Sequence, residues 1–129
     1  MSDEAAVTRV LADYYSAFST LNLEATLPYF HEPCLFIGPQ GVGAVTTSAG
    51  LAGIIAPAME NLRARGYGRS ELSLQQLKLL SATASLASGT AIRYKTDGQE
   101  LDRVGVTYLL HKTDSGWKIA VLVLHDTPE

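Results

Sequence analysis

Residues 84–126 read ASLASGTAIRYKTDGQELDRVGVTYLLHKTDSGWKIAVLVLHD. Two turn signals, Asp97-Gly98 and Asp114-Ser115-Gly116, divide this stretch into segments that run from Leu86 to Lys95, from Leu101 to Lys112 and from Trp117 to Asp126. Asp-Gly between segments of alternating apolar and polar residues is a strong hairpin signal. We therefore predict three long antiparallel strands. The last of them is apolar on both faces, which requires cover on both sides of the sheet.

Size and composition indicate one globular domain that spans residues 1–129. The chain is 47% hydrophobic and 18% charged, which is an ordinary globular balance. Its net charge of −3 argues against a nucleic-acid-binding protein or one that binds an anionic membrane. Cys34 is the single cysteine, so no intrachain disulfide can form. The acidic start, Met1-Ser2-Asp3-Glu4, is no secretory signal, and we expect a cytoplasmic protein without a membrane segment.

Helical spacing and turn residues predict the elements that precede the hairpins. In chain order these are a helix over 3–20, a second helix from Leu23 to about Phe30, a strand Cys34–Ile37 with its hairpin partner Val42–Thr46, a third helix capped by Thr47 or Ser48 and kinked or split at Pro57, and a strand Glu71–Leu79. The order is helix-helix-β-β-helix-β-β-β-β. It predicts an α+β fold in which a curved antiparallel sheet wraps around three helices as a cone with a ligand pocket at its mouth.

Hairpin geometry predicts which side chains share a face of this sheet. The first turn places Ile92 opposite Arg103, and a four-residue second turn places Lys112 opposite Trp117 and then Arg103 opposite Asp126. An aliphatic face carries Ala87, Gly89, Ala91, Arg93, Asp102, Val104, Val106, Tyr108, Leu110, Trp117, Ile119, Val121, Val123 and His125. A mixed face carries Leu86, Ser88, Thr90, Ile92, Tyr94, Arg103, Gly105, Thr107, Leu109, Ala120, Leu122, Leu124 and Asp126. Three helices can cover only one face, so we expect a homodimer through the sheets.

The layout resembles the NTF2-like superfamily, and within it the SnoaL-like group. The resemblance rests on the ending Gly116-Trp117-Lys118-Ile119 with its alternating apolar residues, and on an opening helix that runs through Tyr14-Tyr15 into Asn22-Leu23-Glu24-Ala25. It covers nearly the whole chain and implies the cone-shaped fold. It implies the function only loosely, because that cone serves isomerases, cyclases, dehydratases, epoxide hydrolases, transport factors and oligomerisation modules.

The resemblance also implies roles for particular positions. Ketosteroid-isomerase-like members place an oxyanion donor where Tyr14 stands, but their proton-abstracting acid falls at Gly38 and their second acid near Gly105 or Thr107. Epoxide-hydrolase-like members use an Arg-x-Asp pair and an Asp on a neighbouring strand, which Arg103 and Asp126 match with Gly105 in place of one carboxylate. This alignment puts the mixed face at the pocket and the aliphatic face at the dimer interface.

The candidate catalytic residues are therefore Asp126 as acid/base, Arg103 as its partner and Tyr14 as a donor. Candidate ligand contacts on the mixed face are Thr90, Tyr94, Thr107 and Leu122. The alternative for Arg103 and Asp126 is a cross-strand ion pair of less than about 1 kcal/mol. A second cross-strand pair, Arg93 with Asp102, is interpreted as structural. His125 is adjacent to Asp126 but faces the other side of the strand. No metal or nucleotide motif occurs, so we expect no cofactor.

These observations favour a protein that binds a small hydrophobic molecule in its pocket. One alternative is an isomerase, polyketide cyclase or hydrolase that uses Asp126, Arg103 and Tyr14. The other is a dimerisation or interaction module whose cone is filled by its own side chains.

Overall fold

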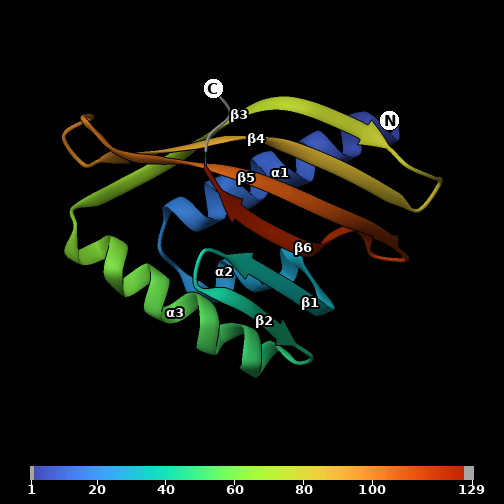
Figure 1. Ribbon diagram of the computed structural model, residues 1–129, viewed down its shortest axis with the longest axis horizontal. Coiled ribbons are helices and arrows are strands. Elements are labelled where there is room, and N and C mark those ends of the chain that lie inside the picture. Colours follow the sequence, from blue (N-terminus) through green and yellow to red (C-terminus); the bar gives the residue numbers. More distant parts are fainter. Residues whose placement is uncertain (1, 127–129) are drawn as a thin grey trace.

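The computed structural model describes residues 2–126 and has the predicted α+β order (Figure 1). Its elements are α1 (Asp3–Ser19), α2 (Leu23–Thr26), a 3-10 turn η1 (Leu27–Tyr29), β1 (Phe30–Gly38), β2 (Gly41–Val45), α3 (Ser48–Ala64), β3 (Tyr67–Leu79), β4 (Ala84–Lys95), β5 (Glu100–Thr113) and β6 (Gly116–His125). The sheet order is β2-β1-β6-β5-β4-β3, in which only β1 and β6 are parallel neighbours. The sheet is curved and open, and it wraps around α1 while α3 runs along its open side (Figure 1).

Both long helices begin at side-chain caps. The Ser2 hydroxyl accepts a hydrogen bond from the Ala5 amide at 3.1 Å, and the Thr47 hydroxyl accepts one from the Gly50 amide at 3.2 Å. Helix α3 continues through Pro57, so of the two expected outcomes, a kink or a split, the split does not occur. Proline deprives the carbonyl four residues earlier of its partner. That carbonyl belongs to Gly53, which is exposed and can be solvated.

The second helix is shorter than expected, and the strand after it is longer. Helix α2 ends at Thr26, and Phe30 already belongs to β1, whereas the sequence pattern predicts helix to about Phe30 and strand only from Cys34. The early start of β1 comes from its parallel pairing with β6, where Phe30 lies opposite Ile119. This contact joins residues far apart in the chain, so no local pattern reveals it.

Most of the hairpin pairs are as predicted, and the register departs from the prediction at two points. Near the first turn, a shift places Tyr94 opposite Glu100. Ile92 lies opposite Arg103, and Lys112 lies opposite Trp117. A bulge in β6 then leaves Ala120 without a partner, because Ile119 pairs with Leu110 and Val121 with Leu109. One extra residue turns every later side chain to the other face.

The predicted pairing of Arg103 with Asp126 is wrong for this reason. Beyond the bulge, Gly105 lies opposite His125. Leu122 and Leu124 now share a face with Val106 and Tyr108. Val121, Val123 and His125 lie on the opposite face, with Thr107 and Leu109.

The helices pack on the face that carries Ala91, Val106 and Tyr108, which we call the inner face. The core joins its side chains to those of the helices: Val7, Leu11, Tyr14, Tyr15, Leu51, Ile55, Met59, Ala87, Ala91, Val106, Tyr108, Leu110, Trp117, Ile119 and Leu122 are all buried. The other, outer face has no helix upon it (Figure 1). Within the described part of the chain, no helix has the length and apolar character needed to cross a bilayer. The cytoplasmic location stays a prediction.

Gly89 allows β3 to lie close against β4, and this makes a testable pair of substitutions. A Cβ atom at Gly89 would lie 2.1 Å from the Ser73 carbonyl oxygen, whereas one at the exposed Gly53 in α3 meets nothing within 4 Å. We expect Gly89→Ala to lower the free energy of unfolding by about 1–3 kcal/mol, because the clash is with backbone. Gly53→Ala should raise it by about 0.5–1 kcal/mol, because alanine favours a helix. Urea denaturation of both variants measures these changes, and equal effects would contradict the close approach.

Candidate functional site

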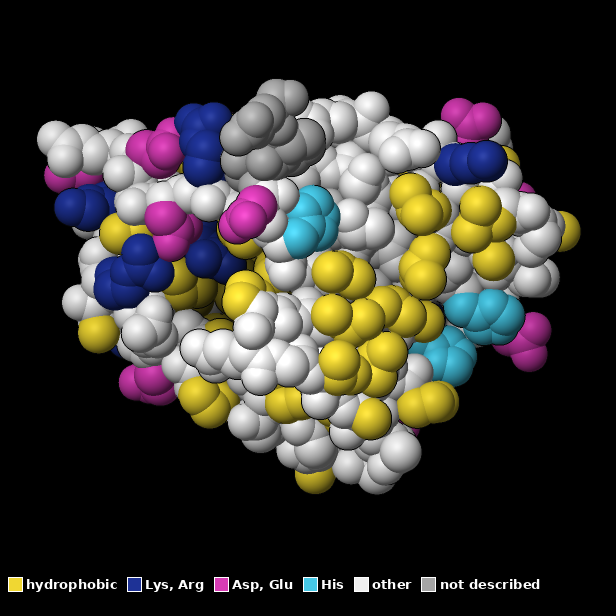
Figure 2. Space-filling view, in the orientation of Figure 1, with side chains coloured by type: hydrophobic (Ala, Val, Ile, Leu, Met, Phe, Trp, Pro, Cys, Tyr) yellow, Lys and Arg dark blue, Asp and Glu magenta, His cyan; other side chains and the backbone are white. Residues whose placement is uncertain are grey.

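A cavity of about 540 Å³ opens between α1, α3, the β1–β2 hairpin and the inner face of β4–β6. Its wall is formed by Tyr14, Tyr15, Phe18, Phe36, Ile37, Gly38, Gln40, Gly41, Val42, Gly43, Ile54, Ile55, Ala58, Ser70, Ala91, Arg93, Val106, Tyr108, Leu122 and Leu124. Most of these are apolar. Figure 2 shows the hollow on the left of the molecule, with hydrophobic side chains inside and both basic and acidic side chains around it. The volume lies in the range of small-molecule sites.

Three tyrosines form an aromatic cluster on one side of the cavity. The Tyr15 and Tyr108 hydroxyls are hydrogen-bonded at 2.6 Å. The Tyr14 ring packs edge-on against Tyr15 and Phe30, with centroids 5.6 and 5.3 Å apart. Such edge-to-face contacts hold rings in defined orientations. This part of the wall is therefore rigid.

The three phenols are hydrogen-bond donors at neutral pH. Burial raises the pKa of Tyr14 and of Tyr108 well above the ordinary value. Burial also raises the pKa of Tyr15 to about 12, although its hydrogen bond with Tyr108 acts in the opposite direction. Among residues 2–126, none is hydrogen-bonded to the Tyr14 hydroxyl, which makes this group available to a ligand.

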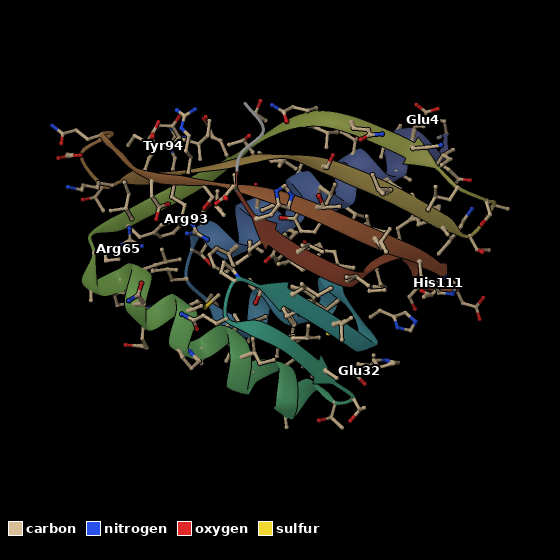
Figure 3. The ribbon with its side chains drawn as sticks, in the orientation of Figure 1. Glu4, Glu32, Arg65, Arg93, Tyr94 and His111 are labelled. Carbon is tan, nitrogen blue, oxygen red and sulfur yellow. The ribbon has the colours of Figure 1, made fainter. Side chains whose placement is uncertain are left out.

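A second polar group lies at the mouth of the cavity. Arg93 of β4 lies directly opposite Asp102 of β5, with Nη1 at 3.4 Å from Oδ1. Arg65, at the end of α3, places Nη2 at 2.8 Å from the other oxygen of Asp102. Figure 3 shows Arg65 and Arg93 close together, where α3 ends near the sheet. The cluster therefore ties α3 to the sheet and carries two positive charges against one negative charge.

Two of the predicted site residues reach the cavity. Tyr14 and Leu122 line it, and Leu122 does so because the bulge at Ala120 turns it inward. Gly38, the position where the resemblance implies a proton-abstracting acid, also lies in the wall. Gly105 belongs to the outer face with His125.

The other predicted residues lie outside the cavity wall. Arg103 is exposed and donates through Nε to Glu100 at 3.1 Å, and Asp126 is exposed just after β6. The Thr107 hydroxyl is hydrogen-bonded to Nε2 of His125 at 2.8 Å. The Tyr94 ring lies 4.3 Å beneath the guanidinium of Arg69, and Thr90 is buried away from the cavity wall.

The expectation that the mixed face is the pocket side is therefore wrong. The aliphatic face offers more apolar area to bury, and the helices cover that face. The structure does not bring Asp126, Arg103 and Tyr14 together, and their catalytic roles stay untested predictions. Sequence reasoning missed Arg93 because it assigned this residue to the dimer face. The signal that could have found it is a charged residue that follows Ala87, Gly89 and Ala91 on the same face of one strand.

Metal ligands do not gather in the part of the chain that the structure describes. No three His, Cys, Asp or Glu side chains of residues 2–126 lie so that they could hold an ion. Cys34 is buried, and burial raises the pKa of its thiol. His31 and His111 stack edge-on at 5.4 Å between centroids, far along the chain from one another.

The hydrogen bond between Tyr15 and Tyr108 should be visible in a double-mutant cycle. Tyr15→Phe leaves the buried Tyr108 hydroxyl without its partner, so we expect a loss of about 1–3 kcal/mol in the free energy of unfolding. Tyr15→Phe combined with Tyr108→Phe should cost less than the sum of the two single changes. Urea denaturation of the original chain, the two single variants and the double variant measures the coupling. Tyr29→Phe, the same substitution outside this pair, is the control. Additive losses would show that the pair contributes nothing as a pair.

Comparisons with known proteins agree with the fold of this chain. Solved structures of similar fold include a domain of unknown function with a cystatin-like fold from Nostoc punctiforme, at 18% identity and a TM-score of 0.79, with 98% of this chain and 78% of that chain covered. An NTF-2-like protein of unknown function from Shewanella oneidensis has 17% identity and a TM-score of 0.76 over 95% of this chain and 98% of its own. A ketosteroid isomerase-like protein from Erwinia carotovora has 16% identity and a TM-score of 0.73 over 99% and 98%.

Identities at this level show the fold alone. No curated protein sequence matches the chain. A family model described as NTF2-like protein (DUF6841) matches residues 3–127, almost the whole sequence. The predicted NTF2-like resemblance is thereby confirmed, and the chain belongs to this NTF2-like family.

Proposed function

We propose that this protein binds a small, largely hydrophobic molecule in the cavity between α1, α3 and the inner face of the sheet. The observation that carries the proposal is the cavity of about 540 Å³, with an apolar wall and a few polar groups. Pockets that combine apolar walls with a small number of placed polar groups are typical of small-molecule sites. The free Tyr14 hydroxyl supplies one such group.

The cavity favours binding over the two alternatives. An interaction module with a filled cone would leave no space of this volume. An enzyme that works through Asp126 and Arg103 would need these residues at the cavity, but both are exposed and neither belongs to the cavity wall. Among the described residues, the cavity wall contains neither a carboxylate nor an imidazole. General acid–base chemistry needs such a group within hydrogen-bond reach of the substrate.

Filling the cavity tests the proposal. We expect N-phenyl-1-naphthylamine, a neutral probe that fluoresces in apolar surroundings, to bind the purified protein. Ala91→Phe places a ring within the wall and should weaken binding about tenfold or more, because cavity volume is lost. Fluorescence titration measures the dissociation constant.

Ala82→Phe, in the exposed turn before β4, makes the same substitution away from the cavity and should bind the probe like the original chain. If circular dichroism shows that Ala91→Phe is unfolded, Ile54→Trp, on the α3 side of the wall, serves as a second cavity-filling variant. Probe binding that survives both fillings would contradict the proposal.

We also propose that the outer face pairs with a second copy of the chain. A row of apolar side chains, Leu35, Val121, Leu109 and Leu86, crosses four strands in direct register. Leu109 is 36% exposed, and the other three are half-buried. Figure 2 shows hydrophobic side chains gathered in this region, over β5 and β6. Contiguous exposed apolar surface is typical of an interface.

A charge within this row should prevent the pairing. We expect the protein to be a dimer by size-exclusion chromatography with light scattering. Leu109→Asp should be a folded monomer, because a dimer would bury its carboxylate without a partner. Leu80→Asp, in the exposed turn after β3, should remain dimeric. A monomeric original chain would rule out the interface.

A further inference from the structure

Arg93 is the single charged side chain in the cavity wall, among the residues that the structure describes. It lies on the inner face of β4, two residues from Ala91, and its side chain is only 22% exposed. A guanidinium offers five N–H donors. Of these, one has a protein partner within residues 2–126, the Asp102 carboxylate at 3.4 Å. A largely buried cation with unfilled donors favours an anionic partner.

Asp102 does not serve as the full anionic partner of Arg93. Its other oxygen is bound at 2.8 Å by Arg65, the shorter of its two contacts with arginine. Two guanidinium groups therefore share one carboxylate, and the cluster keeps one net positive charge at the cavity mouth. Arg65 is more exposed, at 40%, and lies outside the wall. The surplus charge that a ligand meets is therefore that of Arg93.

We propose that the ligand is an amphiphilic monocarboxylic acid, whose carboxylate binds Arg93 while its apolar body lies against the aromatic cluster. This inference rests on the proposed function, since it names the class of molecule that the cavity takes. The planar guanidinium matches a carboxylate with two parallel hydrogen bonds. Tyr14, which also lines the cavity, is free to donate to another oxygen of the ligand.

The balance of charge selects a monoanion over a dianion. One negative charge neutralises the cluster, whereas a phosphate monoester with nearly two would leave it negative beside Asp102. The remaining negative charge of the phosphate and that of Asp102 would repel each other, and this repulsion opposes binding. The same reasoning predicts that Asp102 restrains acid binding, because it competes for the donors of Arg93.

Matched acid and amide pairs test the inference. Octanoate with octanamide, and 4-phenylbutyrate with 4-phenylbutyramide, have the same shape and differ in charge. We expect each acid to bind about tenfold or more tightly than its amide, because a charged partner strengthens the hydrogen bond to Arg93. Displacement of N-phenyl-1-naphthylamine and isothermal titration calorimetry give the dissociation constants.

Two substitutions at the cluster should act in opposite directions. Arg93→Gln should weaken binding of the acids by about tenfold or more and affect the amides far less, so the preference disappears. Asp102→Asn should tighten binding of the acids, an effect that structural damage would not produce. Arg103→Gln removes an arginine from the outer face of the next strand. It should change neither the affinity for the acids nor that for the amides.

The outcomes separate this inference from the proposed function. A preference for acids that is lost in Arg93→Gln and enhanced in Asp102→Asn supports the carboxylate site. Probe binding with equal affinity for acids and amides overturns the inference and leaves the proposed function standing. An acid preference that persists in Arg93→Gln also overturns it. Failure of the probe and of all four compounds to bind would overturn both.

Discussion

The bulge at Ala120 is the local constraint on which both faces of the sheet depend. It comes after Trp117 and Ile119, which are buried in the core, and it turns the rest of β6 over. Leu122 and Leu124 consequently complete the cavity wall. Without the extra residue, Val121 and Val123 would point inward, and the outer row would lose its member on β6. A single unpaired residue thus sets the lining of the site and the character of the surface behind it.

The cavity and the core both lie between the helices and the inner face of the sheet. Side-chain size decides which part of this layer is filled and which part is open. Where Trp117, Leu110 and Ile119 meet α1, the space is filled. Toward the other end of β4 and β5, small residues such as Ala91 and Val106 face the β1–β2 hairpin and α3, and space remains. The tyrosine cluster lies at the boundary, where the hydrogen bond between Tyr15 and Tyr108 satisfies two buried hydroxyls. The cavity is therefore held open by a rigid wall.

Much of the fold could be predicted from the sequence, because its signals were local. The Asp97-Gly98 turn predicts the pairing of Ile92 with Arg103, and the cap of α3 is Thr47, one of the two residues expected. The bulge had no such signal. Residues 119–124 are all apolar, so no alternation showed where the register shifted. Without the bulge, the sequence predicts Asp126 opposite Arg103, and the resemblance then implies that the mixed face, which does not carry Arg93, lines the pocket.

The hydrogen-bonding groups of the cavity wall indicate which chemistry the site can support. Proton abstraction needs a base within hydrogen-bond reach of the bound molecule. The described wall offers phenols whose pKa values burial raises, a guanidinium, and the neutral side chains Gln40 and Ser70. Raised phenol pKa values keep these hydroxyls protonated at neutral pH, so they can donate a hydrogen bond but do not act as bases. At Gly38, the position where the ketosteroid-isomerase-like resemblance implies a base, there is no side chain. A wall rich in donors is suited to hold the oxygen atoms of a ligand, and this supports the proposed binding of a small molecule.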